Sequence, residues 1–306
     1  MKLYAHAYFS LRRSPEEPFS MKRRLRRPKS IRRSFFIRWK ALRQAIGPAP
    51  SQQTLLFIFG CQRSGTTLLS EIFDKDPRTR LYGEASVLSH TEPDKRLRLL
   101  PNPAIRKELS CARAPLIVLK PLVESQNAGT LLTDFEGSKA IWIYRNFKDV
   151  ALSNINRFGQ GNGIDDLTPM VNSDPNNWRS ERIDDKSLVL LNKYYSPTMT
   201  IFDAAVLFWI VRNSLFFSQK LESNSNLMLC KYEQLTDNPS ITMNNIYQFL
   251  GETYPGDRIT QGTHTRSIDK GSEINLSPEI HELADKLQAR LDAIAMLHSG
   301  ELANER

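Results

Sequence analysis

Short runs of consecutive apolar residues recur along the chain and are separated by longer polar or amphipathic segments. Runs without alternation are typical of strands that helices cover on both faces. The stretches between them have helical apolar spacing, most clearly from Asp203 to Leu221. Alternating strands and helices predict an α/β fold with a central, mainly parallel sheet and ligands at the carboxyl ends of its strands. The runs predict strands at 55–60, 115–120, 140–144 and 227–232.

Two further helices have clear sequence signals. One is predicted from Thr66 to Asp74, directly after the first strand. The other opens at Ser277-Pro278, a capping serine followed by proline at the first helical position. We interpret the second as an amphipathic helix that packs on the domain, because apolar residues recur in it at helical spacing. These are Ile280, Leu283, Leu287, Leu291 and Ile294.

Phe158 to Met199 differs from the rest of the chain because it is rich in Gly, Pro, Asn and Asp. Structureless segments of this length are usually binding loops or lids. We therefore interpret residues 159–199 as an inserted loop region. It belongs to a single domain predicted at 51–306, which follows a basic leader at 1–50.

Positive charge is concentrated near the N-terminus. Residues 1–50 carry 14 Lys and Arg and two Glu, a net of +12, whereas residues 51–306 have a net charge of −3. Residues 20–46 combine this charge with Phe, Trp, Ile and Leu. A solvated leader and a peripheral contact with an anionic membrane both remain open. No nucleic-acid partner is predicted, because the remaining 256 residues supply no basic patch or recognition motif.

Neither a transmembrane helix nor a secretory signal is predicted, since the sequence has no run of eighteen apolar residues and no signal-type apolar core. Cys61, Cys111 and Cys230 are scattered, without disulfide or metal spacing. This usage favours a reducing compartment, most simply the cytoplasm. No metal site is predicted.

Residues 55–69, LLFIFGCQRSGTTLL, read as a strand, a glycine-bounded turn and a helix. Such a turn directs backbone N–H groups and a helix N-terminus at a phosphate. Thr66 stands where a nucleoside-triphosphatase loop has lysine, and Arg63 is the loop's cation. The loop is therefore predicted to bind a phosphate in chemistry other than ordinary ATP hydrolysis. Its residues are Gly60, Cys61, Gln62, Arg63, Ser64, Gly65, Thr66 and Thr67.

A second phosphate motif is predicted at the end of strand 140–144. Arg145 ends this strand, and Ser153 follows eight residues later, about two helical turns into the next element. A guanidinium fork and a hydroxyl that converge on one place suit a dianionic phosphate.

With these two motifs the chain resembles the sulfotransferase family, whose sulfuryl donor is 3′-phosphoadenosine-5′-phosphosulfate (PAPS) and whose product is 3′-phosphoadenosine-5′-phosphate (PAP). Residues 63–67 resemble the family's 5′-phosphosulfate loop and residues 145–153 its 3′-phosphate motif. The RSGTT form resembles the membrane-associated and bacterial branches. The resemblance implies a P-loop-type three-layer fold and covers residues 53–295.

The resemblance also implies catalytic roles. Glu84, after Gly83, resembles the base of tyrosylprotein and some carbohydrate sulfotransferases. Lys120 resembles a strand-end lysine that, with Arg63, stabilises charge near the sulfuryl group. His90 is the alternative base. Residues 159–199 would shape the acceptor side.

For the nucleotide, the resemblance implies an adenine contact by Tyr232, on a strand-Tyr-Glu segment. Ser267 and Lys270 lie in a late loop that resembles the one that closes over the nucleotide. Trp209 is interpreted as a core residue.

The implied function is metal-independent transfer of a sulfuryl group from PAPS to a hydroxyl or amine. The acceptor is left open among small molecules, carbohydrates, lipids and protein tyrosine. Two alternatives also stay open: a P-loop kinase or NTPase acting on a small molecule, and a non-catalytic nucleotide-binding protein.

Overall fold

The structure, a computed structural model, describes residues 31–48, 50–90, 98–121 and 123–299. The chain divides into two compact units, residues 1–42 and 43–306. The described part of the first unit belongs to helix α1 (Ile31–Ile46), whose last turn lies in the second unit. The predicted leader overlaps this helix, and its residues 1–30 lie outside the described residues.

A five-stranded parallel sheet organises the second unit, in the order β2-β3-β1-β4-β5. This confirms the predicted α/β class and the parallel sheet. Four strands are the predicted ones. The edge strand β2 was missed, because its four residues include a charged Arg80 and form no apolar run. The strands are β1 (Thr54–Gly60), β2 (Thr79–Tyr82), β3 (Leu116–Leu119), β4 (Lys139–Tyr144) and β5 (Leu227–Lys231).

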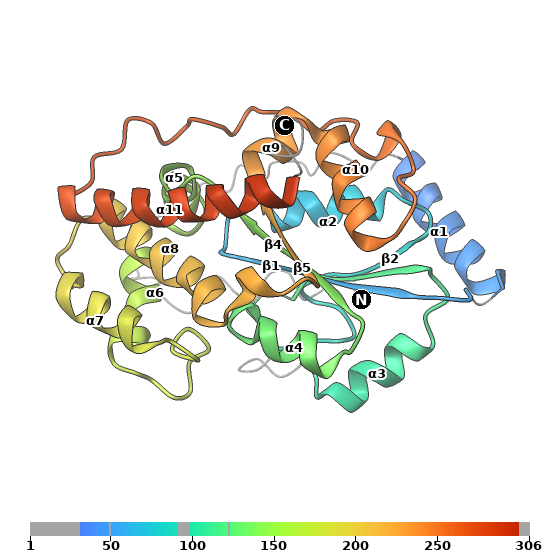
Figure 1. Cartoon of the computed structure of the whole chain (residues 1–306), viewed down its shortest axis with the longest axis horizontal. Helices are drawn as coiled ribbons and strands as arrows, with labels where there is room; N and C mark the ends of the chain where they lie inside the picture. The colour runs from blue at the N-terminus through green and yellow to red at the C-terminus, as the bar shows by residue number, and fades with distance from the viewer. Residues whose placement is uncertain (1–30, 49, 91–97, 122, 300–306) are drawn as a thin grey trace, which may run out of the picture. The chain divides into compact units, whose positions relative to one another are not determined.

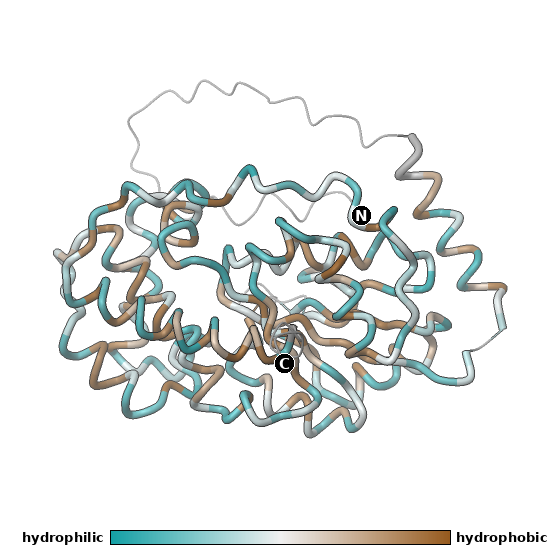
Figure 2. Tube along the Cα trace, turned by 45° about the horizontal axis from the view of Figure 1, so that its top comes forward, coloured by the Kyte–Doolittle hydropathy of each residue, from teal (hydrophilic) through white to brown (hydrophobic). Residues whose placement is uncertain are grey.

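Both faces of the sheet are covered, as the unbroken apolar runs predict. In β1, Leu56 and Ile58 join one buried cluster and Phe57 and Phe59 the other. Figure 1 shows α2 and α10 on one side of the sheet and α3 and α4 on the other. Hydrophobic positions gather on the central strands in Figure 2. The fold is therefore three-layered.

The helices divide between the two clusters. The cluster that contains Leu56 includes residues of α2 (Thr66–Asp74), α9 (Tyr232–Asp237) and α10 (Pro239–Leu250). The other includes residues of α3 (Asn102–Ser110), α4 (Ala128–Asp134), α5 (Phe147–Phe158), α6 (Asn162–Val171), α7 (Asp185–Tyr194), α8 (Ile201–Ser218) and α11 (Pro278–Ser299). Three 3₁₀ turns complete the described elements: η2 (Ser125–Asn127), η3 (Leu221–Ser223) and η4 (Asp257–Ile259).

Helix α8 is the central helix of the larger cluster. It is apolar on all sides, which is typical of a helix surrounded by protein. Among the described residues it is the one helix long and apolar enough to cross a membrane, but 72% of it is buried inside the protein. Trp209 is fully buried in it and donates to the backbone oxygen of Arg145 (3.1 Å).

The prediction of a loop at 159–199 was wrong in its secondary structure, because α6 and α7 lie within it. The glycine and proline residues of this segment suggested a loop, but in the folded protein two of them lie within helix α6. A Cβ on Gly163 would lie 2.8 Å from the backbone nitrogen of Ala205, so the glycine permits α6 to approach α8 closely. Pro169 is accommodated inside α6. The acceptor-side role of this segment stays a prediction.

An acid-sensitive contact is predicted where α11 meets the edge strand β5. The backbone N–H of Leu229 donates to Nδ1 of His298 (2.9 Å), and burial lowers the pKa of His298 below its ordinary value of 6.5. The unfolded chain therefore binds a proton more readily than the folded chain. Stability should fall as pH drops below about 6.5, because a protonated ring cannot accept this hydrogen bond.

Urea unfolding measured from neutral to mildly acidic pH tests this expectation. His298→Gln should flatten the acid loss of unfolding free energy, whereas His264→Gln, at an exposed position, should leave it unchanged. Identical pH profiles for the two variants would contradict the assignment.

Candidate active site

The predicted phosphate loop connects β1 to α2 at the carboxyl edge of the sheet. Its two glycines are required by close packing: a Cβ on Gly60 would lie 2.3 Å from the backbone oxygen of Ile143, and one on Gly65 would lie 2.3 Å from the Tyr232 ring. Gly65 has a left-handed φ of 102° and is the N-cap of α2. The loop is therefore held tightly against β4 and Tyr232.

Cys61 and Ser64 lie inside the loop. Burial raises the pKa of the Cys61 thiol to about 12, so this cysteine packs beneath the loop and is no nucleophile. Ser64 is fully buried, and its hydroxyl has no hydrogen-bond partner among the described residues.

Arg63 connects the two predicted phosphate motifs. It adopts a left-handed φ of 67°, and its Nε donates to Oγ of Ser153 on α5 (3.0 Å). Burial and the neighbouring guanidinium groups of Arg157 and Arg145 lower the pKa of Arg63. An anion placed among these groups would relieve the repulsion between them.

Lys120 lies between the predicted base and the loop. It follows β3 and is 5% exposed. Its Nζ donates to Oγ1 of Thr67 (3.0 Å) and forms an ion pair with Oε1 of Glu84, whose side chain is 40% exposed. The sequence did not reveal this pair, because 35 residues separate the two positions.

Arg145 lies at the carboxyl end of β4 and is 5% exposed. Its guanidinium stacks on the ring of Tyr232 (4.6 Å to the centroid), pairs with Asp149 (3.2 Å) and donates to the backbone oxygen of Ser267. Its Nε is buried and has no hydrogen-bond partner among the described residues. Nε of Arg145, a residue predicted to bind phosphate, is therefore a hydrogen-bond donor that is still unused.

The predicted adenine contacts form a second group around Tyr232. Its hydroxyl and that of Ser267 are hydrogen-bonded (2.6 Å). Lys270, in contrast, is exposed, although the backbone N–H groups of Asp269 and Gly271 on either side donate to Asp149. Tyr232 and Ser267 therefore lie with the other predicted ligands, and no contact joins Lys270 to them in the described residues.

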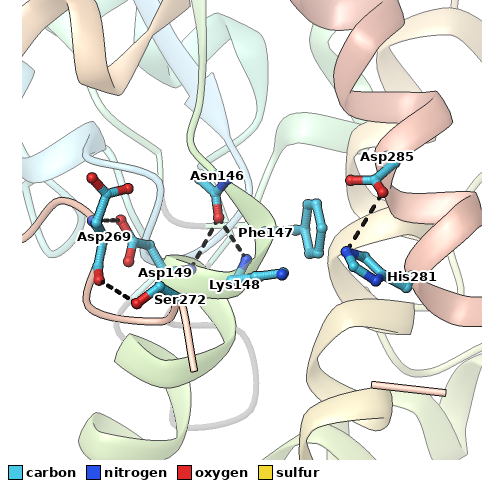
Figure 3. Close-up of a pocket in the computed structure, with 8 residues that line it drawn as sticks. All are labelled: Asn146, Phe147, Lys148, Asp149, Asp269, Ser272, His281 and Asp285. Carbon is cyan, nitrogen blue, oxygen red and sulfur yellow. Dashed lines mark hydrogen bonds and ion pairs between the residues drawn. The ribbon is translucent and has the colours of Figure 1, made fainter. Parts of the chain in front are cut away.

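A pocket of about 250 Å³ adjoins the start of α5 (Figure 3). The side chain of Asn146 caps α5 by accepting from the N–H groups of Lys148 and Asp149. His281 and Asp285 of α11 lie across the pocket, 3.5 Å apart. The residues that line this pocket carry both positive and negative charges, so they favour no single ligand. Asp149 instead holds the loop at residues 269–271 by accepting two backbone hydrogen bonds from it.

A buried polar cluster behind Gln62 was not predicted from the sequence. The Gln62 amide donates to Asp166 (2.7 Å) and to Asn154 (3.3 Å), and Asn162 donates to the same two side chains. Arg179 pairs with Asp166 (2.6 Å), yet burial still raises the pKa of this carboxyl. The segment predicted to be acceptor-side is thereby attached to the predicted phosphate loop.

A second buried network joins the segments that carry Glu84 and Lys120. Arg98 pairs with Glu124 (2.8 Å) and with Glu181. Glu181 also accepts from Gln126, which in turn accepts from Arg212 (3.0 Å). Burial lowers the pKa of Arg212 to about 10. No sequence motif predicts this network, because its residues come from four distant segments.

Arg157 is a further residue that was not predicted from the sequence. It lies one helical turn after Ser153 on α5 and is exposed. Its charge adds to that of Arg63 and Arg145. Among the described residues, no group of three or more His, Cys, Asp or Glu side chains could hold a metal ion.

The sequence profile of the sulfotransferase domain matches residues 53–290. The chain belongs to the sulfotransferase family. This confirms the resemblance drawn from the two phosphate motifs, and it makes the protein a sulfotransferase. No curated protein sequence matches the chain significantly.

Solved sulfotransferases are similar to the chain at low identity. The enzyme from Alicyclobacillus acidocaldarius is 14% identical, with a TM-score of 0.43 over 79% of this chain and 94% of that one. The sulfotransferase domain of the curacin biosynthetic pathway is 15% identical, with a TM-score of 0.44 over 79% and 99%. A mouse sulfotransferase complexed with PAP is 16% identical, with a TM-score of 0.40 over 82% and 88%.

The Asp166 cluster gives a stability prediction. Asp166→Ala leaves Arg179 and Gln62 without their buried partner, so the unfolding free energy should fall by about 3 kcal/mol or more. The adjacent Asp165→Ala, at an exposed position on the same helix, should cost less than about 1 kcal/mol. Urea unfolding of both variants measures the difference, and equal losses would show that Asp166 is not a buried partner.

Proposed function

We propose that this sulfotransferase takes its sulfuryl group from PAPS and transfers it to a hydroxyl or amine of an acceptor. One observation carries the proposal: the donor loop contacts a residue from each of three other predicted site elements. Arg63 donates to Ser153, Thr67 accepts from Lys120, and Gly65 packs against Tyr232. Residues far apart in sequence thus meet around one anion-binding turn.

The unused hydrogen-bonding groups support a phosphorylated nucleotide. The Ser64 hydroxyl and Nε of Arg145 are buried without partners in the described residues, and such groups cost free energy unless a ligand or water satisfies them. Ser64 is in the predicted 5′-phosphosulfate loop and Arg145 in the predicted 3′-phosphate motif. A nucleotide phosphorylated at both positions would satisfy both.

The chemistry follows from the charges. PAPS supplies the activated sulfuryl group, and the protein contributes position and charge stabilisation. Lys120 pairs with Glu84, and this half-exposed carboxylate is proposed to accept the acceptor's proton. Arg63 and Lys120 stabilise the negative charge on the donor oxygens.

The acceptor class stays open among small molecules, carbohydrates, lipids and protein tyrosine. Residues 159–199 are proposed to form its binding side, because Asp166 connects α6 to the donor loop through Gln62. The half-exposed Glu84 would meet the acceptor from the other side.

Calorimetric binding of PAP, ADP and ATP in EDTA tests the donor. PAP should bind most tightly, because it alone offers a phosphate to Arg145 and Ser153. Arg63→Ala and Ser153→Ala should each weaken PAP roughly tenfold or more, while Arg113→Ala, at the amino end of β3, should have no effect. A metal-dependent preference for ATP would instead indicate a P-loop kinase or NTPase.

Glu84→Gln should lower turnover by about 10²-fold or more while PAP affinity stays nearly unchanged. Glutamine retains an acceptor for Lys120 but is no base. Turnover with PAPS, measured on an acceptor found by screening, and PAP calorimetry give the two readouts. A parallel loss of PAP affinity would contradict the role of Glu84 as base.

A further inference from the structure

Helix α1 carries an apolar stripe along one side. Phe35, Trp39, Leu42 and Ile46 recur at intervals of three and four residues, so they share one face of the helix. They are 73%, 41%, 59% and 76% exposed. Single exposed apolar residues are common, but a continuous exposed stripe marks an interaction surface. Hydrophobic and hydrophilic positions alternate along α1 in Figure 2.

The borders of the stripe are basic. Arg38 and Arg43 occupy positions on either side of it, and the sequence of α1 contains five Lys and Arg and no Asp or Glu. The leader before it adds further positive charge, to a net of +12 over residues 1–50. An apolar stripe with cationic borders on one helix has the chemistry of a helix that lies in the interface of an anionic bilayer.

The last turn of α1 shows which side of the helix the larger unit holds there. The side-chain amide of Gln44 donates to the backbone oxygens of Thr79 (3.0 Å) and Pro77 (3.2 Å). Gln44 lies roughly opposite the stripe, whereas Ile46, the last member of the stripe, is 76% exposed. At this turn the polar side is attached and the apolar side is open.

We propose that the stripe of Phe35, Trp39, Leu42 and Ile46 docks the protein on the surface of an anionic lipid bilayer. The apolar side chains enter the boundary between headgroups and acyl chains, and the flanking arginines contact the lipid phosphates. Trp39 has the ring type that is enriched at this boundary. The docking does not rest on the PAPS assignment.

Co-sedimentation of the full chain with vesicles tests the docking. Binding to vesicles of phosphatidylcholine and phosphatidylglycerol should exceed binding to phosphatidylcholine alone and should weaken as salt screens the charges. The double variant Phe35→Ser, Leu42→Ser should lose roughly tenfold or more of this binding. Equal binding to both vesicles, or no binding to either, would overturn the proposal.

Ile37 provides the matched control. It lies on the same helix, away from the stripe, and is 44% exposed. Ile37→Ser therefore removes one apolar side chain from the same helix, as each of the single variants Phe35→Ser and Leu42→Ser does, but it should change vesicle binding less than twofold. Equal losses of vesicle binding in Ile37→Ser and the double variant would overturn the proposal, because binding would then not depend on the apolar stripe.

Two further readouts exclude other occupants. Vesicles should shift the tryptophan emission to the blue, and Trp39→Phe should abolish the shift, because Trp142 and Trp209 are fully buried and Trp178 is stacked between Arg179 and Arg212. Sedimentation velocity without lipid should give the same oligomeric state for the wild type and the double variant. If the wild type were a dimer that binds no vesicles and the double variant were a monomer, the stripe would instead be assigned to contact with a second copy of the chain.

The outcome is separable from that of the donor proposal. PAP calorimetry requires no lipid, and vesicle binding requires no nucleotide. Tight PAP binding with no vesicle binding would overturn the docking alone, and the reverse result would overturn the donor assignment alone.

Discussion

The parallel pairing of β1 with β4 is the constraint on which the active site depends. Gly60 pairs with Ile143 at the end of both strands, and a side chain at residue 60 would overlap the backbone of β4. Because parallel strands end at the same edge, this pairing delivers the loop after Gly60 and the guanidinium of Arg145 to one place. Ser153 reaches Arg63 only because α5 begins directly after β4.

Electrostatics then determines what this edge can bind. Arg157 and Arg145 lower the pKa of Arg63, whereas the buried Asp149 forms an ion pair with Arg145. Unbalanced, partly desolvated cations are costly in the free protein, and that cost is recovered when a highly charged anion binds. The ion pair between Lys120 and Glu84 lies beside this group, so the predicted base lies next to the predicted donor site.

The buried networks around Asp166 and Arg98 extend the same site away from the donor. Gln62 connects the loop to α6, and Arg98 connects the segment after Glu84 to Glu124 and Glu181. Buried polar groups of this kind are stable only when each finds its partner, so they restrict the segments predicted to form the acceptor side to one arrangement. The −3 net charge of residues 51–306 contrasts with the net charge of +12 over the N-terminal 50 residues.

Local signals in the sequence determined most of the sheet and the family, and they predicted the phosphate loop. Unbroken apolar runs predicted four of the five strands. The RSGTT loop with Arg145 and Ser153 identified the sulfotransferase domain, because each phosphate motif needs arginine and hydroxyl side chains within a short stretch of sequence. Tertiary structure alone decided the pairing of Lys120 with Glu84, the helices at residues 162–171 and 185–194, and the Asp166 cluster. These depend on contacts between distant segments: Gly163 suggests a loop until it is placed against Ala204, and Asp166 resembles a surface carboxylate until Arg179 and Gln62 bury it.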